Sequence, residues 1–196
     1  MFTDTNFPDR WEDYGDQELW IAFRKGNRDA FSVLFLRYYQ PLFRYGMNFS
    51  TVRETVKDSI QKLFYRLWEK RNLIDTPQSV QAYLYVSLRR ILLRLNKREN
   101  SRERRNAQYL EQGMDGLISI EEEIILEEER KKREELYKSC IKALTPRQKE
   151  ALLLRVDNGM SNTEIAGIMG ITEKRVRNLI YESIKRLRRE IYEQTE

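Results

Sequence analysis

The feature of this chain that most constrains its fold is the spacing of its apolar residues, which recur three and four positions apart along most of its 196 residues. That spacing places them on one face of a helix, whereas a half-buried strand would alternate apolar and polar positions. Glycine and proline, which disfavour helix interiors, are scarce at eight and four residues. The sequence therefore predicts an all-α fold.

Local signals mark where several helices begin. Three residue pairs have the spacing of a capping box, in which two side chains bond the free backbone N–H groups of a helix start. These pairs are Thr51 with Glu54, Thr145 with Gln148 and Ser161 with Glu164. Thr76 and Thr145 each precede a proline, which is favoured at the first helical position. We predict helices that begin at these points.

Charge divides the chain into two basic segments with an acidic segment between them. The net charge is +5, which favours a polyanionic partner. Residues 84–105 and 172–189 are rich in Lys and Arg, whereas residues 111–129 contain acidic residues and no basic ones. We predict two small helical domains, residues 1–99 and 126–196. They are joined by a flexible acidic linker, residues 100–125, which contains Gly113 and Gly116.

The residue types that are missing exclude several classes of function. The chain has no histidine and a single cysteine, Cys140, so the usual zinc ligand sets and histidine-dependent catalytic triads cannot form. A disulfide framework is equally impossible, which favours a cytoplasmic protein with Cys140 in an apolar core. We expect no catalytic residue, metal site, cofactor or small-molecule substrate, and thus no enzyme. The sequence also shows no signal peptide and no stretch suited to direct membrane insertion.

The C-terminal part has the layout of a helix-turn-helix. Ser161 begins one predicted helix, Gly170 closes it, and Thr172 begins the next. On the second helix, Val176 and Leu179 belong to an apolar stripe that also contains Ile180, Ile184 and Leu187. A solvated basic face on an ordinary three-helix bundle would explain the charge alone, but two caps around a glycine turn favour DNA binding. The predicted DNA-contacting residues are Thr172, Lys174, Arg175, Arg177, Asn178 and Tyr181.

A predicted helix over residues 54–71 carries a mixed polar and aromatic face. Its polar side shows Asp58, Gln61, Lys62 and Tyr65, with Trp68 at the border. Plain solvent exposure would explain the polar residues. Exposed aromatic side chains among charges are, however, typical of protein-binding surfaces, and we predict such a surface here.

The next predicted helix, residues 77–97, has an aromatic residue among cations. At 100° per residue, one outer face gathers Tyr83, Ser87, Arg90, Arg94 and Lys97. A cationic face with an incidental tyrosine is the plain alternative. Arginines that track phosphates beside a ring that stacks on a base would instead hold DNA whose strands are separating. The preceding loop adds Asn72, Asp75 and Thr76, which suit a pocket for an extruded base.

Taken in order, these segments resemble the extracytoplasmic function group of sigma factors, in the sigma-70 family. Residues 56–74 resemble the helix of that group that binds the polymerase clamp, with matches at Asp58, Gln61, Phe64 and Trp68; Lys57 departs from an acidic position. Residues 79–99 are similar to the segment that melts the minus-ten element, although Tyr83 stands where the family often has Trp. Residues 144–190 are similar to the domain that reads the minus-thirty-five element, while Leu179 and Ile184 replace frequent basic residues.

The resemblance implies a non-enzymatic initiation factor. Residues 1–99 would be sigma region 2 and residues 126–196 sigma region 4, and the partners would be core RNA polymerase, promoter DNA and an anti-sigma factor. The alternative is a stand-alone helix-turn-helix transcriptional regulator with a helical N-terminal sensor or dimerisation domain. An all-α N-terminal half argues against the α/β receiver that many such regulators carry.

Overall fold

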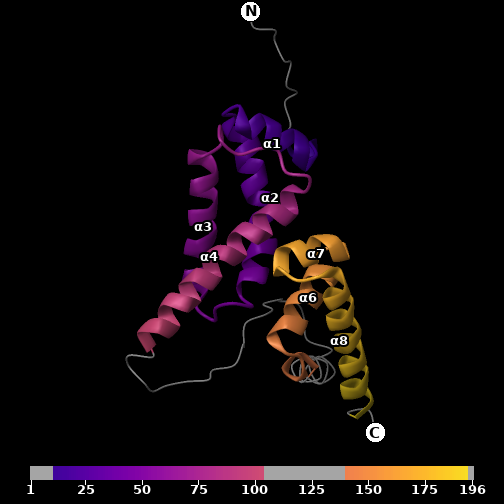
Figure 1. Cartoon of the computed structure of the whole chain (residues 1–196). Coiled ribbons are helices and arrows are strands. Elements are labelled where there is room, and N and C mark those ends of the chain that lie inside the picture. Colours follow the sequence, from indigo (N-terminus) through magenta and orange to yellow (C-terminus); the bar gives the residue numbers. More distant parts are fainter. Residues whose placement is uncertain (1–10, 104–139, 194–196) are drawn as a thin grey trace, which may run out of the picture.

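The computed structural model describes residues 11–103 and 140–193, and every regular element in these two ranges is helical, as predicted. The N-terminal half contains a short 3-10 helix η1 (Trp11–Asp13), α1 (Asp16–Arg24), α2 (Arg28–Gly46), α3 (Arg53–Glu69) and α4 (Val80–Glu103). The C-terminal half contains α6 (Pro146–Val156), α7 (Asn162–Met169) and α8 (Glu173–Glu193). Figure 1 shows α4 running diagonally between the other N-terminal helices and the C-terminal ones.

The core of the N-terminal half lies among α1 to α4 and is rich in aromatic rings. Phe23, Phe31 and Trp68 meet at the end where α1, α2 and α3 converge, with centroids of Phe31 and Trp68 5.1 Å apart. At the other end of α2, Gly46 lets α3 approach, because a Cβ there would lie 2.5 Å from Val56 Cγ1. Tight packing at both ends holds α2 and α3 side by side.

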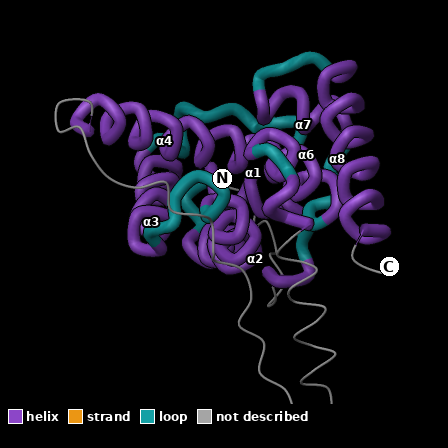
Figure 2. Tube along the Cα trace, turned by 90° about the horizontal axis from the view of Figure 1, so that it is seen from below, coloured by secondary structure: helices purple, strands orange, loops and turns teal. Residues whose placement is uncertain are grey.

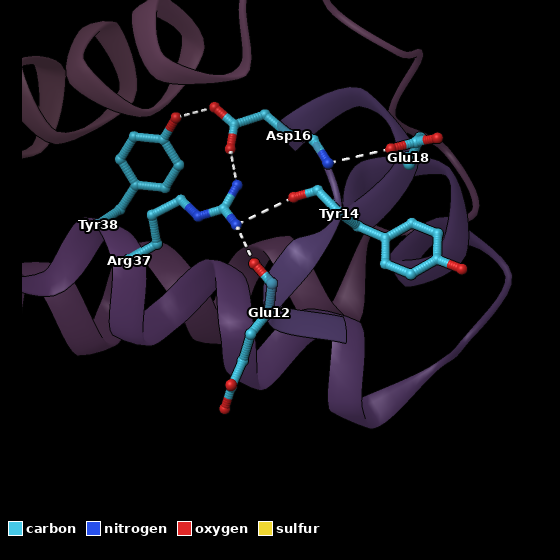
Figure 3. A network of polar contacts seen from close by, with 7 residues as sticks. Glu12, Tyr14, Asp16, Glu18, Arg37 and Tyr38 are labelled. Atoms are coloured by element: carbon cyan, nitrogen blue, oxygen red, sulfur yellow. Dashed lines mark hydrogen bonds and ion pairs between the residues drawn. The ribbon is translucent and has the colours of Figure 1, made fainter. Parts of the chain in front are cut away.

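A polar network ties the start of the described chain to α2. Arg37 on α2 pairs with Asp16 at 2.6 Å and donates from its other terminal nitrogen to the carbonyls of Glu12 and Tyr14. The Tyr38 hydroxyl donates to the second carboxylate oxygen of Asp16 (Figure 3). Burial, followed by the bond to Asp16, raises the pKa of Tyr38, so the phenol stays protonated as a donor. This network fixes α1 against α2.

Two predicted start signals in the N-terminal half, the Thr51–Glu54 capping box and Thr76-Pro77, are wrong. α3 begins at Arg53 after Val52, with no side-chain cap bond, so Thr51 and Glu54 form no capping box. α4 begins at Val80, where the Ser79 hydroxyl accepts from the backbone N–H of Ala82 at 3.2 Å. Thr76 and Pro77 therefore lie in the α3–α4 loop, residues 70–79, rather than in a helix.

The helix starts of the C-terminal half are confirmed. Thr145 caps α6 by accepting from the Gln148 N–H at 3.3 Å, with Pro146 at the first helical position. Ser161 caps α7 in the same way through Glu164. Cys140 is buried and free, as the sequence predicts.

The two halves pack against each other. α7 lies against α4, and buried apolar residues from both halves belong to one hydrophobic cluster (Figures 1 and 2). Beside this contact, Asn158 accepts a hydrogen bond from the Tyr85 hydroxyl through its side chain and one from Gln81 through its carbonyl. The contact therefore combines apolar packing with polar bonds.

A buried carboxylate crosses the contact between the halves. Glu150 on α6 is 5% exposed and accepts from Arg89 Nε at 2.7 Å and from the Tyr45 hydroxyl at 2.8 Å. Burial lowers the pKa of Arg89, but the bond to Glu150 and its charge outweigh this and leave that pKa raised. Burial first, and the charge of Glu150 next, raise the pKa of Tyr45. The Arg89 guanidinium thus stays charged and the Tyr45 phenol stays protonated, so both can donate to Glu150. Residues 104–139, including most of the predicted linker, lie outside the described residues, so the division into two domains stays a prediction.

Candidate nucleic-acid interface

The turn between α7 and α8 has the geometry of a helix-turn-helix. Gly170 ends α7 in the left-handed region at φ 66°, a conformation that glycine adopts without a Cβ penalty. Its N–H and that of Ile171 both donate to the carbonyl of Ala166. Thr172 then caps α8 by accepting from the Arg175 N–H at 3.3 Å. This sharp turn sets α8 at an angle to α7.

The six residues predicted to contact the minus-thirty-five element all lie exposed near the start of α8. They are Thr172, Lys174, Arg175, Arg177, Asn178 and Tyr181. Tyr181 has 65% of its surface exposed. Arg177 forms a surface pair with Glu173 at 3.6 Å, and Glu173 also accepts from the Thr163 hydroxyl on α7. Glu173, which the sequence interpretation missed, thus links the two helices beside the basic face.

The face of α8 that packs inward differs in part from the predicted apolar stripe. Val176 and Leu179 are buried, as expected, but Ile184 is 40% exposed. Ser183 takes the buried position in its place and satisfies its hydroxyl by donating to the Leu179 carbonyl at 2.6 Å. A serine that bonds its own helix backbone can occupy a core position without an unpaired polar group.

The minus-ten set is divided between α4 and the α3–α4 loop. Arg90, Arg94 and Lys97 are exposed along one side of α4, with Ser87 half-buried beside them. Asn72, Asp75 and Thr76 are exposed in the loop. The arginines and the loop side chains are therefore accessible to a nucleic acid.

Tyr83 is more enclosed than a fully exposed stacking residue. Its ring lies edge-on to Trp20 of α1, with centroids 5.3 Å apart, so the side chain is half-buried. The phase of α4 correctly puts Tyr83 on the side of Arg90 and Arg94. The helical pattern of α4 alone could not show that α1 crosses this end of it.

The α3–α4 loop is held by side chains that sequence reasoning missed. Gln17 on α1 donates to the carbonyls of Pro77 at 2.9 Å and Gln78 at 3.0 Å. One and two turns further along α1, Trp20 Nε1 donates to the Asp75 carbonyl at 3.3 Å and Arg24 donates to the Thr76 hydroxyl at 3.2 Å. These contacts join positions more than fifty residues apart, so no local sequence motif predicts them.

The exposed face of α3 contains four of the five residues predicted to bind polymerase. Asp58, Gln61 and Lys62 are exposed, and Tyr65 has 63% of its surface exposed. The Tyr65 hydroxyl donates to Glu69 at 2.6 Å, a bond that raises the pKa of the phenol. An exposed aromatic residue among charges therefore stands on this face, as predicted.

Trp68, the fifth residue, has a different setting. Its ring packs against Phe23 and Phe31 in the core, and the Arg71 guanidinium lies over the ring, 4.7 Å from its centroid. Only part of the ring remains exposed. Its packing gives Trp68 a structural part in the N-terminal half whatever it contributes to binding.

The part of the chain that the structure describes has neither a cluster of metal ligands nor a helix suited to a membrane. Within residues 11–103 and 140–193, no group of three or more His, Cys, Asp or Glu side chains is placed to hold a metal ion. In the same part of the chain, no helix is long and apolar enough to cross a bilayer.

Comparison with known proteins identifies the C-terminal half. Residues 134–187 match the family model described as sigma-70, region 4, which covers α6, α7 and most of α8. A sequence comparison with curated proteins finds no match.

Solved structures share the fold of most of the chain. One is CnrH, solved in complex with the cytosolic domain of CnrY, at 19% identity and a TM-score of 0.58, with 88% of this chain and 94% of CnrH covered. Another is the sigma factor RpoE of Bartonella quintana, solved in complex with the anti-sigma factor NepR, at 18% identity and a TM-score of 0.60, with 83% and 96% covered. Residues 134–187 therefore match sigma-70 region 4, and the chain has the fold of CnrH and of the sigma factor RpoE.

Proposed function

We propose that this protein is a sigma factor of the extracytoplasmic function group, which binds core RNA polymerase and directs it to specific promoters. The observation that carries the proposal is the match of residues 134–187 to sigma-70 region 4 in a chain of which 83–88% follows the fold of CnrH and the sigma factor RpoE. The factor supplies promoter recognition and strand opening, and polymerase supplies the catalysis of RNA synthesis. Its work takes place in the cytoplasm, where polymerase and DNA are found.

The exposed surfaces support one task each. The basic face of α8 offers Arg and Lys for guanine and phosphate and Asn178 for adenine, so it reads the minus-thirty-five element. Arg90 and Arg94 of α4, with Tyr83 and the α3–α4 loop, hold the separated strand of the minus-ten element. Asp58, Gln61, Lys62 and Tyr65 of α3 bind core polymerase.

Both promoter contacts together require the halves to separate. Elements centred about 25 base pairs apart lie about 85 Å apart along straight B-DNA, at about 3.4 Å per base pair. The longest described helix is α4, whose 24 residues measure about 36 Å, and α4 touches α7 directly. The packed arrangement is therefore a resting form, in which the chain cannot occupy both elements. RpoE in its complex with NepR suggests the class of partner that would keep this chain at rest, an anti-sigma factor.

Gel filtration with bacterial core polymerase tests the proposal against the stand-alone regulator. A sigma factor co-elutes with core in the absence of DNA, whereas a stand-alone regulator binds DNA and leaves core unchanged. The matched pair of variants is Gln61→Lys on the exposed face of α3 and Lys25→Ala at the exposed end of α1. We expect only Gln61→Lys to weaken co-elution, with both variants keeping the helical circular dichroism of the parent.

A further inference from the structure

The α3–α4 loop is largely exposed, yet the backbone of its second half is bonded to one helix, α1. Gln17 bonds two successive carbonyls of the loop, those of Pro77 and Gln78, and Trp20 bonds the Asp75 carbonyl. Bonds to the main chain fix the course of the loop and leave the side chains of Asn72 and Asp75 exposed. The loop is thus held from behind while its outer side stays accessible.

Trp20 connects this loop to Tyr83. Its indole N–H bonds the loop, while its ring lies 5.3 Å from the Tyr83 ring in an edge-to-face arrangement. Trp20 is 1% exposed and also packs edge-on against Phe23, so it has little room to move. One rigid side chain therefore sets the position of both the loop and the tyrosine.

α1 itself is anchored on its other side. The pair of Arg37 with Asp16 and the bonds from Arg37 to the Glu12 and Tyr14 carbonyls tie the start of α1 to α2 (Figure 3). A continuous series of contacts therefore runs from α2 through α1 to the loop and Tyr83. Groups held in place before a ligand arrives lose less conformational freedom when they bind it.

From this arrangement we infer that α1 belongs to the DNA-opening apparatus, and that Gln17 and Trp20 are positioning residues that set the α3–α4 loop and Tyr83 for an unpaired strand. The inference rests on the proposed function. Neither residue needs to touch DNA, because both act through the loop. Arg24 donates to the Thr76 hydroxyl and adds a third side chain of α1 that holds the loop.

The test uses the full chain with core polymerase and compares strand opening on a duplex promoter with transcription from the same promoter premelted at the minus-ten element. Gln17→Ala removes two bonds from an exposed side chain, and Trp20→Phe removes the indole N–H but keeps an aromatic ring. Ile21→Ala, on the same helix and 45% exposed, is the matched control. Permanganate reactivity of unpaired thymines reports opening of the promoter, and thermal unfolding reports the stability of each variant.

We expect Gln17→Ala and Trp20→Phe to slow opening of the duplex promoter about fivefold or more, the cost of losing a hydrogen bond of ordinary net strength. Activity on the premelted promoter should stay within about twofold of the parent, because the strands there are already separate. Ile21→Ala should match the parent on both templates. A loss of protein stability alone would lower the activities on the duplex and premelted promoters together. The ratio of these two activities therefore separates an effect on positioning from an effect on stability.

Unchanged opening by Gln17→Ala, or an equal loss on duplex and premelted templates, would overturn the inference. If Trp20→Phe proves unstable, exposed Gln17→Ala decides alone. Failure of the parent chain to open any promoter with core polymerase would instead refute the proposed function. If the parent opens promoters and the variants open them equally fast, only the role of α1 is refuted.

Discussion

The pair of Arg89 and Glu150 should be a principal tie between the halves. Its atoms are 2.7 Å apart, with 18% of the Arg89 side chain and 6% of the Glu150 side chain exposed. At an effective dielectric constant of about 20, that distance gives a gross attraction of about 6 kcal/mol. Removing one partner of a buried pair costs about 3–5 kcal/mol, since the remaining charge is left buried. Arg89→Ala leaves Glu150 with only the Tyr45 hydroxyl among the bonds described above.

Arg89→Ala should therefore shift the balance away from the packed form by a factor between about one hundred and a few thousand. Small-angle X-ray scattering should show a larger radius of gyration, and guanidinium unfolding should show lower stability. The control is Lys57→Ala, which breaks a pair with Glu54 at the same 2.7 Å but on the surface, and which should cost less than about 0.5 kcal/mol. Replacing both members of the buried pair, as in Arg89→Met with Glu150→Leu, should recover part of the loss. If Arg89→Ala changes scattering and unfolding no more than Lys57→Ala does, the pair does not hold the halves together.

Four further predictions concern separate surfaces. Arg175→Ala and Asn178→Ala should each cost about 1–3 kcal/mol in promoter binding and relax base preference in the minus-thirty-five element, as mapped on promoter libraries; unchanged preference would remove α8 as the reader. Gln61→Lys should raise the dissociation constant for core polymerase in a titration, and an unchanged constant would remove α3 from the interface. Tyr83→Ala should slow permanganate-detected opening while duplex binding stays nearly intact, since stacking on an unpaired base is worth about 1–3 kcal/mol; opening at the parent rate would assign melting to other residues. The Ser161 N–H lowers the pKa of Glu164, so the stability that this cap contributes is present above about pH 4.5 and is lost as the pH falls through the lower pKa of the folded state. Glu164→Gln should remove that part of the acid dependence of the unfolding free energy. An acid dependence identical to that of the parent would refute this role of Glu164.

Helices were predictable where the signal is local. Ser161 and Thr145 cap their helices because each finds its partner three residues away, within one turn. The same reasoning failed at Thr76, because the carbonyls of Pro77 and Gln78 bond to Gln17 on another helix and the first turn of α4 starts after them. A distant donor thus overrode a local start signal.

The candidate surfaces were predictable only as far as helical phase determines exposure. Phase put the basic residues of α8 and the polar residues of α3 outside, and the structure has them exposed. It could not reveal the partners of Glu150, which lie 61 and 105 positions away, or the contact of Trp20 with Tyr83. Pairings of that kind depend on how helices cross, which no periodicity within one helix encodes.

Promoter-directed initiation in a purified system tests the central claim most directly. Genomic DNA from the organism that encodes the chain would be transcribed by core polymerase with and without the protein, and the 5′ ends of the transcripts mapped. The account predicts discrete start sites that appear only when both are present, preceded by two shared sequence elements at a constant spacing. The same distribution of 5′ ends with and without the protein, in a reaction where core polymerase elongates normally, would contradict it.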